Sequence, residues 1–252
     1  MSFAVPADAY TRFMGRYSSR LAVEFVSLLD VPAGARALDV GCGPGVLTEL
    51  LVARLGASAV AAIDPSGPFV AAARERLPGV DVRQGTAESL PFESDSFDLV
   101  LAQLVVHFMR DPVAALGEMG RVTRPSGVVA ASVWDYENDR SPLSAFWRAA
   151  RTLDPEAPGE ASLAGARAGH LVSLFTEAGL RDVRQEVLRI SVPVDGFDDW
   201  WEPFTYGVGP AGAYLAGLSP DAAERLQARC AELLPSGPFA VSAAAWVALG
   251  TP

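Results

Sequence analysis

The chain has 252 residues, half of them apolar, which suits one α/β domain with a modest insertion and leaves no room for two large independent domains. Its net charge is −10, from 30 acidic and 20 basic residues without a basic cluster, and this argues against a nucleic-acid backbone as the main partner. A small-molecule substrate is therefore the expected partner.

Cysteine content and the N-terminal sequence bear on the compartment. Cys42 and Cys230 stand far apart and form neither a disulfide framework nor a zinc pattern. The first ten residues show no basic segment followed by a long apolar core, so no signal peptide is expected. Apolar runs such as 128–133 are too short to span a bilayer. These features predict a cytoplasmic protein with no membrane association.

The first element expected is a helix over 18–29, which lies in an N-terminal arm, residues 1–30, and is ended by Pro32 and Gly34. From 31 to 135, apolar runs alternate with helical segments, as in a parallel sheet with helical crossovers. We interpret this stretch as a cofactor-binding core. The expected strands are 36–40, 59–64, 80–84, 98–103 and 127–134, and the expected helices are 46–55, 68–76 and 112–122.

After Asp135 the alternation becomes irregular. A first insertion, 136–165, holds a helical run at 143–153 and then a Pro/Glu/Ala/Gly-rich stretch, 154–162, that reads as a mobile loop. The alternation returns with a helix at 167–178 and a strand at 181–192. A second insertion, 195–237, is rich in aromatic residues and contains a helix capped by Ser219 with Pro220 at its first position. A last strand is expected at 239–249.

These elements predict one domain, residues 1–252, built on a Rossmann-like, doubly wound α/β sheet of seven strands. The strands at 181–192 and 239–249 are expected to form a hairpin at the sheet edge, with the last strand antiparallel. The helical and aromatic-rich insertion would then lie above the carboxyl ends of the strands, where open α/β sheets bind ligands. It is a candidate lid over a substrate.

Residues 38–45, Leu-Asp-Val-Gly-Cys-Gly-Pro-Gly, form the most informative motif. Gly41, Gly43 and Gly45 permit positive φ and leave no Cβ beside a ligand, and Cys42 lies between the first two. A dinucleotide turn has the spacing G-x-G-x-x-G and meets a pyrophosphate, whereas this turn reads G-x-G-x-G with Asp39 ahead of it. A carboxylate suits a cation better than a phosphate. The motif therefore predicts S-adenosylmethionine as the cofactor and S-adenosylhomocysteine as its product.

Asp64 ends the second expected strand in Ala-Ala-Ile-Asp-Pro, 19 residues after Gly45. A carboxylate there accepts two hydrogen bonds from ribose hydroxyls, and Pro65 belongs to the same turn. The alternative is an ordinary turn aspartate that caps the next helix.

Three further segments resemble known motifs. Residues 85–92 resemble G-D-A-x-x-L-P-F, residues 106–112 resemble L-H-H-x-x-D-P, and residues 115–127 resemble A-L-x-E-x-x-R-V-L-x-P-G-G. With the glycine turn they make the chain similar to class I S-adenosylmethionine-dependent methyltransferases of the ubiquinone- and menaquinone-biosynthesis type. The matches span residues 36–135.

This resemblance implies roles for several residues. Thr86, Ala87 and Glu88 would read the adenine edge, with Thr86 at the place where relatives have an acidic residue; the alternative is a plain polar turn. Gln103 would project from a strand end toward the methyl-bearing sulfur. Arg16, in an aromatic N-terminal segment, would pair with the methionine carboxylate of the cofactor, unless it simply faces solvent.

Catalytic and substrate-binding candidates are fewer. His107, one of two histidines, is the natural general base, and Gln103 is the second catalytic candidate. The alternative for His107 is a helix-start histidine bonded to a backbone carbonyl. Trp134, Trp200, Trp201 and Tyr206 either line an apolar substrate pocket or form the core of the insertion. Tyr10, in the N-terminal segment, is a further candidate for the substrate pocket, unless that segment is an ordinary lead-in to the first helix.

The sequence thus predicts metal-independent methyl transfer from S-adenosylmethionine to an O, N or C nucleophile of a small, apolar or aromatic molecule. No His/Cys/carboxylate cluster suggests a metal site. A non-catalytic S-adenosylmethionine-binding sensor or scaffold is the alternative. An oxidoreductase is disfavoured because the third glycine comes one residue too early. A monomer or a homodimer is expected.

Overall fold

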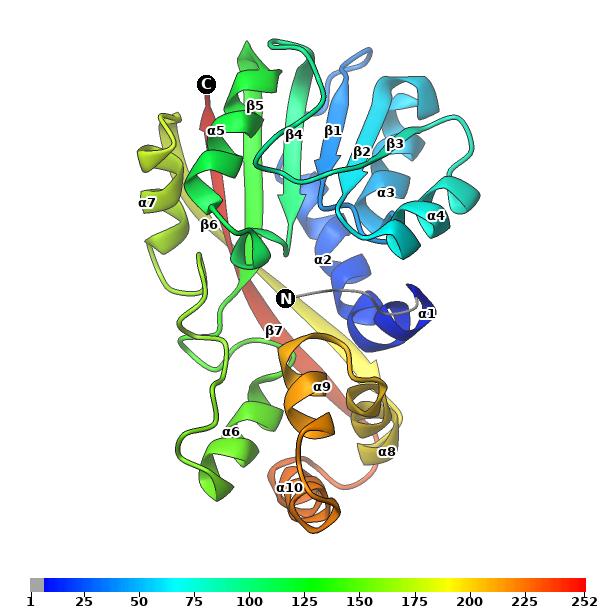
Figure 1. Ribbon diagram of the computed structural model, residues 1–252, viewed down its shortest axis with the longest axis vertical. Helices are drawn as coiled ribbons and strands as arrows, with labels where there is room; N and C mark the ends of the chain where they lie inside the picture. Colours follow the sequence, from blue (N-terminus) through cyan, green and yellow to red (C-terminus); the bar gives the residue numbers. More distant parts are fainter. Residues whose placement is uncertain (1–6) are drawn as a thin grey trace.

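The computed structural model describes residues 7–252, which form one seven-stranded sheet flanked by helices, with a helical region below it (Figure 1). The strand order is β3-β2-β1-β4-β5-β7-β6. Strands β1 to β5 are parallel, and β7 runs antiparallel to both of its neighbours, β5 and β6. The predicted Rossmann-like sheet with an antiparallel last strand is therefore confirmed. The strands are β1 Ala37–Val40, β2 Val60–Asp64, β3 Asp81–Gln84, β4 Phe97–Gln103, β5 Thr123–Trp134, β6 Arg181–Val194 and β7 Phe239–Thr251.

In the part of the chain that the structure describes, helices cover both faces of the sheet. From β1, the strand order continues through β2 to β3 on one side and through β4 to β5 on the other. Because crossover connections between parallel strands are right-handed, this reversal of direction places helices on opposite faces of the sheet. The helices are α1 Ala7–Tyr10, η1 Thr11–Gly15, α2 Arg16–Ser27, α3 Val46–Leu55, η2 Ala57–Ala59, α4 Gly67–Arg76, η3 Val106–Phe108, α5 Pro112–Val122, α6 Ser144–Leu153, α7 His170–Glu177, α8 Phe197–Trp201, η4 Glu202–Tyr206, α9 Gly209–Ala216 and α10 Pro220–Leu233.

Local signals explain where several helices begin. Asp111 caps α5 by accepting a hydrogen bond from the Ala114 amide at 3.0 Å, and Pro112 occupies the first helical position. Ser219 caps α10 in the same way, as predicted, with its hydroxyl 3.3 Å from the Ala222 amide nitrogen. Capped starts of this kind are readable from sequence because they involve neighbouring residues only.

Two boundaries differ from the prediction by more than two residues. β5 begins at Thr123, four residues before the expected 127, because Thr123 pairs with Phe97 before a register shift in β4. The helix expected at 167–178 is shorter, since Gly169 has a φ of 74° and α7 begins only after that left-handed residue. Both differences arise from tertiary pairing or backbone geometry that periodicity does not report.

The β6–β7 hairpin is long and extends beyond the parallel strands into the lower region (Figure 1). It carries α8, α9 and α10 to the same end of the molecule as α6, which comes from the first insertion. The two inserted segments meet through stacked rings, with Phe146 of α6 parallel to Phe204 of η4 at 4.7 Å between ring centroids. Segments far apart in sequence thus form a common apolar cluster below the sheet.

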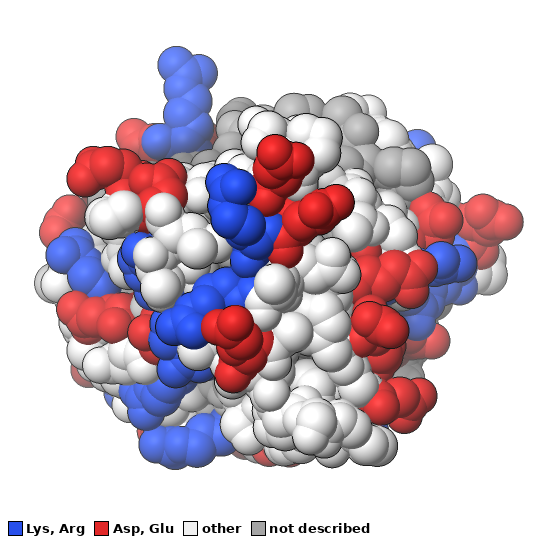
Figure 2. Space-filling model, turned by 90° about the horizontal axis from the view of Figure 1, so that it is seen from below, with Lys and Arg blue, Asp and Glu red and all other residues white. Residues whose placement is uncertain are grey.

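The outer surface of that region carries mixed charge. On the face seen from below, arginine side chains are interrupted by aspartate and glutamate, and no continuous basic surface covers that face (Figure 2). Within residues 7–252, no helix combines the length and the apolar character needed to cross a bilayer.

Candidate functional site

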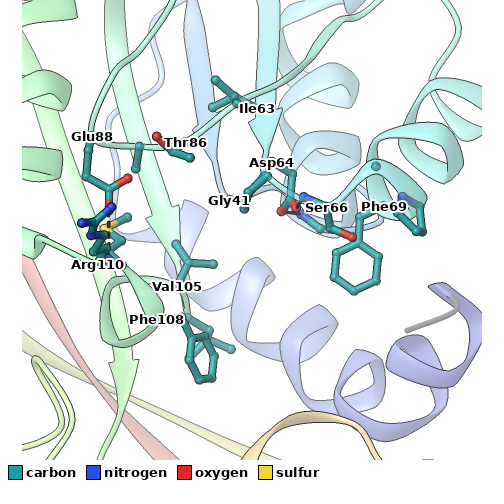
Figure 3. A pocket seen from close by; sticks show the side chains of 18 of the residues that line it. Gly41, Ile63, Asp64, Ser66, Phe69, Thr86, Glu88, Val105, Phe108 and Arg110 are labelled. Carbon is teal, nitrogen blue, oxygen red and sulfur yellow. Dashed lines mark hydrogen bonds between the residues drawn. The ribbon is translucent and has the colours of Figure 1, made fainter. Parts of the chain in front are cut away.

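A cavity of about 640 Å³ opens at the carboxyl ends of the parallel strands (Figure 3). Its volume is in the range of small-molecule and cofactor sites, and its place is the one where doubly wound sheets bind ligands. Its walls come from the turns that follow β1, β2, β3 and β4, and from α1. The lining residues are Tyr10, Gly41, Gly43, residues 63–69, residues 85–88, Leu104, Val105 and residues 108–110.

The glycine turn after β1 forms the floor of the cavity. Gly41 has a φ of 72°, and a Cβ there would lie 2.7 Å from Cγ1 of Val105. Gly43 has a φ of 54° and donates its amide hydrogen to the Asp64 carboxylate at 2.9 Å. Gly45 and Cys42 lie outside the lining: Gly45 starts α3 with a φ of 93° and its Cα faces Leu77, while Cys42 is buried. Two of the three glycines thus face the cavity.

Asp64 projects into the cavity from the end of β2 (Figure 3). Its two carboxylate oxygens accept hydrogen bonds from the amides of Ser66 at 2.8 Å and Gly43 at 2.9 Å. Burial raises the pKa of Asp64, while these two amide bonds oppose the increase. Each carboxylate oxygen retains acceptor capacity for a ligand hydroxyl. Pro65, in the same turn, also lines the cavity.

Asp39 lies outside the lining of the cavity, behind the glycine turn. It is 1% exposed, and its carboxylate accepts a hydrogen bond from the Thr48 hydroxyl of α3 at 2.6 Å. Burial raises its pKa to about 7. Successive strand residues point to opposite faces, and this one points toward α3. The carboxylates that line the cavity are Asp64 and Glu88, and the predicted contact of Asp39 with a cationic ligand stays a prediction.

The turn after β3 places Thr86, Ala87 and Glu88 in the wall of the cavity. The Glu88 carboxylate accepts hydrogen bonds from the backbone amides of Arg110 at 2.9 Å and Asp111 at 3.3 Å. Burial raises the pKa of Glu88, but these amide bonds and a bond from the Thr86 side chain outweigh it and lower the pKa below its usual value. Glu88 is therefore an ionised acceptor beside Arg110 at this edge (Figure 3).

Two residues expected at the cofactor make other contacts. The Gln103 side-chain amide donates to the Ser18 carbonyl at 3.0 Å and lies outside the cavity lining. Arg16 also lies outside it and forms an ion pair with Asp199 of α8. The structure therefore does not bring Gln103 or Arg16 to the other predicted cofactor residues.

The predicted aromatic residues separate into two groups. Tyr10 and Trp134 line a smaller space described below, and Tyr10 also lines the main cavity. Trp200 and Trp201 are buried with Phe204, at ring-centroid distances of 4.8 Å and 6.0 Å, and line neither space. Tyr206 donates its hydroxyl hydrogen to Glu202 at 2.8 Å. The second group packs the helices of the insertion together.

The smaller space, of about 30 Å³, adjoins the cavity and is called the chamber below. Tyr10, Leu104 and Phe108 line both spaces. Leu104 has a φ of 59°, a strained conformation for a residue other than glycine and one that recurs at functional sites. The residues that line the chamber are Tyr10, Phe13, Met14, Leu104, His107, Phe108, Trp134, Tyr136, Leu143, Glu160, Val208, Gly209 and Pro210.

One basic and one acidic side chain, His107 and Glu160, line the chamber. His107 is 6% exposed, and burial lowers its pKa to about 3. Glu160 is 2% exposed, and burial raises its pKa to about 7 against hydrogen bonds from Trp147 and Tyr136. Sequence reasoning missed Glu160, because it lies in the stretch interpreted as a mobile loop and belongs to no motif. An acidic residue next to Trp147 in space leaves no signal in a single sequence.

Comparison with known proteins agrees with this geometry. The family model described as a methyltransferase domain matches residues 38–131. A trans-aconitate 2-methyltransferase of Methylobacterium nodulans is 34% identical over 172 residues, which are 68% of this chain and 64% of that protein. A ubiquinone biosynthesis O-methyltransferase of Azorhizobium caulinodans is 44% identical over 103 residues, 39% of this chain and 40% of that protein.

A solved structure shares the whole fold. The phosphoethanolamine N-methyltransferase 2 of Haemonchus contortus, in complex with phosphomonomethylethanolamine and S-adenosylhomocysteine, has a TM-score of 0.60 and 17% identity. The likeness covers 98% of this chain and 57% of that one. This chain thus spans less than two-thirds of the length of these relatives. The domain match over residues 38–131 and these relatives thus make the chain similar to the class I S-adenosylmethionine-dependent methyltransferases.

Proposed function

We propose that this protein transfers the methyl group of S-adenosylmethionine to an O, N or C nucleophile of a small, apolar or aromatic molecule, without a metal ion. The observation that carries the proposal is the cavity at the strand ends, with bare backbone at Gly41 and Gly43 and carboxylates at Asp64 and Glu88. The match of residues 38–131 to the methyltransferase domain supports the same cofactor.

The residues of the cavity fit an adenosine derivative that carries a positive charge. Gly41 and Gly43 let the backbone approach the ligand, and Asp64 offers acceptors for ribose hydroxyls. Glu88 offers an ionised acceptor for an adenine amine. The charged residues of the lining are Asp64, Glu88 and Arg110, and Arg110 lies beside Glu88 (Figure 3). A lining with more carboxylates than cations favours a sulfonium over a diphosphate.

The chain's own residues mainly bind, align and exclude water. When bound, the sulfonium donor supplies an electrophilic methyl group. Displacement at such a group needs alignment of the nucleophile and desolvation, and no Lewis acid. Leu104, Val105 and Phe108 give the side of the cavity toward the chamber an apolar surface. They are suited to keep water away from the reacting atoms.

The two inserted segments are proposed to cover the acceptor. Tyr136, Leu143 and Glu160 of segment 136–165 line the chamber, and so do Val208 and Gly209 of segment 195–237. Both insertions thus supply walls next to the cofactor cavity, which is the position of a lid. A functional group of the acceptor that reaches the chamber would be enclosed by them.

Calorimetric titration of the purified protein with S-adenosylmethionine, S-adenosylhomocysteine and NAD tests the proposal. We expect both sulfur compounds to bind and NAD not to bind. Asp64→Asn should weaken both by about tenfold or more, since it removes a charge-assisted acceptor. Asp198→Asn, on the exposed surface of α8, is the matched control. Binding of NAD without binding of the sulfonium would falsify the proposal.

Turnover separates an enzyme from a sensor. Protein that binds S-adenosylmethionine should methylate at least one member of an acceptor panel of phenols, alcohols, amines and enolisable carbonyl compounds. Cofactor affinity with no methylated product from any class would support the non-catalytic sensor or scaffold.

A further inference from the structure

The chamber contains a carboxylate that is held in place by two aromatic side chains. Glu160 accepts a hydrogen bond from the indole nitrogen of Trp147 at 2.6 Å, and the Tyr136 hydroxyl also bonds to it. Trp147 belongs to α6 and Tyr136 follows β5, so two elements orient the carboxylate. A buried carboxylate that is oriented in this way and lines a cavity is a candidate for proton transfer.

Two polar atoms of the chamber residues have no hydrogen-bond partner within residues 7–252. They are Nδ1 of His107 and Nε1 of Trp134, both inaccessible to solvent. Both side chains are more than nine-tenths buried and both line the chamber. A buried polar atom without a partner loses its interaction with water and gains nothing in return. A polar group of a ligand that reached either nitrogen atom from the chamber would remove this cost.

The size of the chamber limits that group. A volume of about 30 Å³ is close to that of one water molecule, so a hydroxyl or an amino group fits and a ring does not. The chamber shares Tyr10, Leu104 and Phe108 with the cofactor cavity. A functional group seated in the chamber is therefore next to the cavity, while the body of the molecule must lie along these shared walls.

The number of lone pairs and hydrogens on the bound group decides whether a hydroxyl or an amine can react in the chamber. The indole N–H of Trp134 is a donor only, so the group that meets it must offer a lone pair. A neutral amine has one lone pair, and a bond from Trp134 would occupy the pair that must attack the methyl group. A hydroxyl oxygen has two lone pairs and one proton, so it accepts from Trp134, donates to Glu160 and still attacks.

We infer that the chamber binds the hydroxyl of the methyl acceptor and that Glu160 accepts its proton, so that the reaction is an O-methylation. This inference rests on the proposed function. The acceptor oxygen forms a bond to the methyl carbon as the carbon–sulfur bond of the donor breaks and its electron pair stays on sulfur. The hydroxyl proton passes to a Glu160 oxygen and later to solvent. Atoms and charge balance, because the sulfonium becomes a neutral thioether as Glu160 is neutralised.

The two ionisable groups of the chamber differ in basicity in a way that agrees with this assignment. Burial lowers the pKa of His107 to about 3, which makes it a weak base at neutral pH. The pKa of Glu160 is raised to about 7, close to the pH at which a general base is most effective. Tyr136 and Tyr10 are the other ionisable groups of the chamber lining, and burial raises the pKa of each, so they stay protonated.

Binding of small probes tests the inference without relying on turnover. Phenol, aniline and toluene are titrated calorimetrically into protein saturated with S-adenosylhomocysteine. We expect phenol to bind at least about tenfold more tightly than the other two, because toluene meets neither Trp134 nor Glu160, and the nitrogen lone pair of aniline is delocalised into its ring and accepts only weakly from Trp134. Equal affinity for the three probes, or tighter binding of aniline, would overturn the inference.

Single substitutions test which side chains cause the preference for phenol. Glu160→Gln should remove the preference for phenol and slow methylation of hydroxyl acceptors by at least about 100-fold, which is the usual contribution of a general base. Glu156→Gln, on the exposed part of the same loop, is the matched control and should change neither. Trp134→Phe keeps Glu160 and removes the indole N–H, so it should lower phenol affinity even if Glu160→Gln fails to fold.

The result also separates this inference from the proposed function. If S-adenosylhomocysteine does not bind the wild-type protein, the proposed function fails first. If it binds and the three probes are not distinguished, or if amines are the acceptors that become methylated, only the O-methylation and the role of Glu160 are lost.

Discussion

Arg16 and Asp199, 183 residues apart, form a two-pronged ion pair with nitrogen–oxygen distances of 3.0 Å and 2.7 Å. The pair joins α2, at the edge of the N-terminal arm, to α8, the first helix of segment 195–237. Asp199 also accepts a hydrogen bond from the Asp195 amide at 3.1 Å, so it organises the entry into that segment. The N-terminal arm and the proposed lid are thus directly connected.

Loss of this ion pair should loosen α8 more than it destabilises the fold. Both side chains are about one-third exposed, so Arg16→Gln should lower the free energy of unfolding by only about 0.5 kcal/mol. Amide hydrogen exchange of residues 195–206 should become faster, while exchange in the central strands stays the same. Arg20→Gln, on the exposed side of α2, is the control. Unchanged exchange in 195–206 would show that the pair does not hold this segment.

Gly41→Ala tests the floor of the cavity. The new Cβ would lie 2.7 Å from Val105 and would force alanine into a φ of 72°. We expect a loss of about 2–4 kcal/mol of unfolding free energy, from strain and overpacking together, and much weaker cofactor binding. Chemical denaturation and calorimetry measure the two effects.

Gly34→Ala is the matched control for backbone strain alone. Gly34 has a φ of 82° and nothing within 4 Å of the position a Cβ would take. It should cost only about 1–2 kcal/mol and leave cofactor affinity unchanged. Equal losses in the two variants would mean that the contact with Val105 does not matter.

Glu88→Gln tests the acceptor at the adenine edge. The change removes the charge but keeps a side-chain oxygen for the amides of Arg110 and Asp111. We expect S-adenosylhomocysteine to bind about tenfold more weakly, with little change in thermal stability. Glu93→Gln, exposed in the following turn, should have no effect on binding. An unchanged affinity would place the adenine amine elsewhere.

Asp39 should make stability depend on pH in a defined direction. Its pKa in the folded protein is raised from 3.8 to about 7, so the folded state holds this proton more tightly than the unfolded state. The contribution to stability is complete below the unfolded pKa and is lost as pH rises through about 7. Asp39→Asn removes this loss, and its advantage over wild type should grow between pH 5 and pH 8.

Urea denaturation of both proteins at the two pH values measures this difference. Each unit of pKa shift corresponds to about 1.4 kcal/mol, so a buried group of this kind gives a clear signal. The comparison uses the difference between variant and wild type, because Glu160 titrates in the same range. Asp30→Asn, exposed at the end of the first helical region, should show no such trend. A difference that shrinks toward pH 8 would contradict the assignment.

Local patterns in the sequence predicted most of the fold. The apolar runs of the parallel strands, the proline at the start of α5 and the Ser219 cap each involve residues that are close in sequence. The positive φ at Gly41 and Gly43 likewise follows from the turn they must make after a buried strand. Such features can be predicted because the residues that interact to produce them are close together in the sequence.

Local sequence patterns predicted the candidate functional site only in part. The residues that the structure places in the cavity, Asp64, Thr86 and Glu88 among them, lie at strand ends and belong to short motifs. Asp39 belongs to the same motif, yet it faces Thr48, because the direction of a strand side chain depends on which helix covers that face. Spacing alone does not report that direction.

By itself, the sequence determined a doubly wound sheet and a glycine turn that suits an adenosine derivative, because both depend on local backbone chemistry and on periodic burial. Only the tertiary structure decided which polar groups share a space. It brought Glu160 to Trp147 and Tyr136, placed His107 and Trp134 in the lining of the chamber, and paired Arg16 with Asp199. Those contacts join residues from separate elements, and their free energy depends on distances that exist only after the chain has folded.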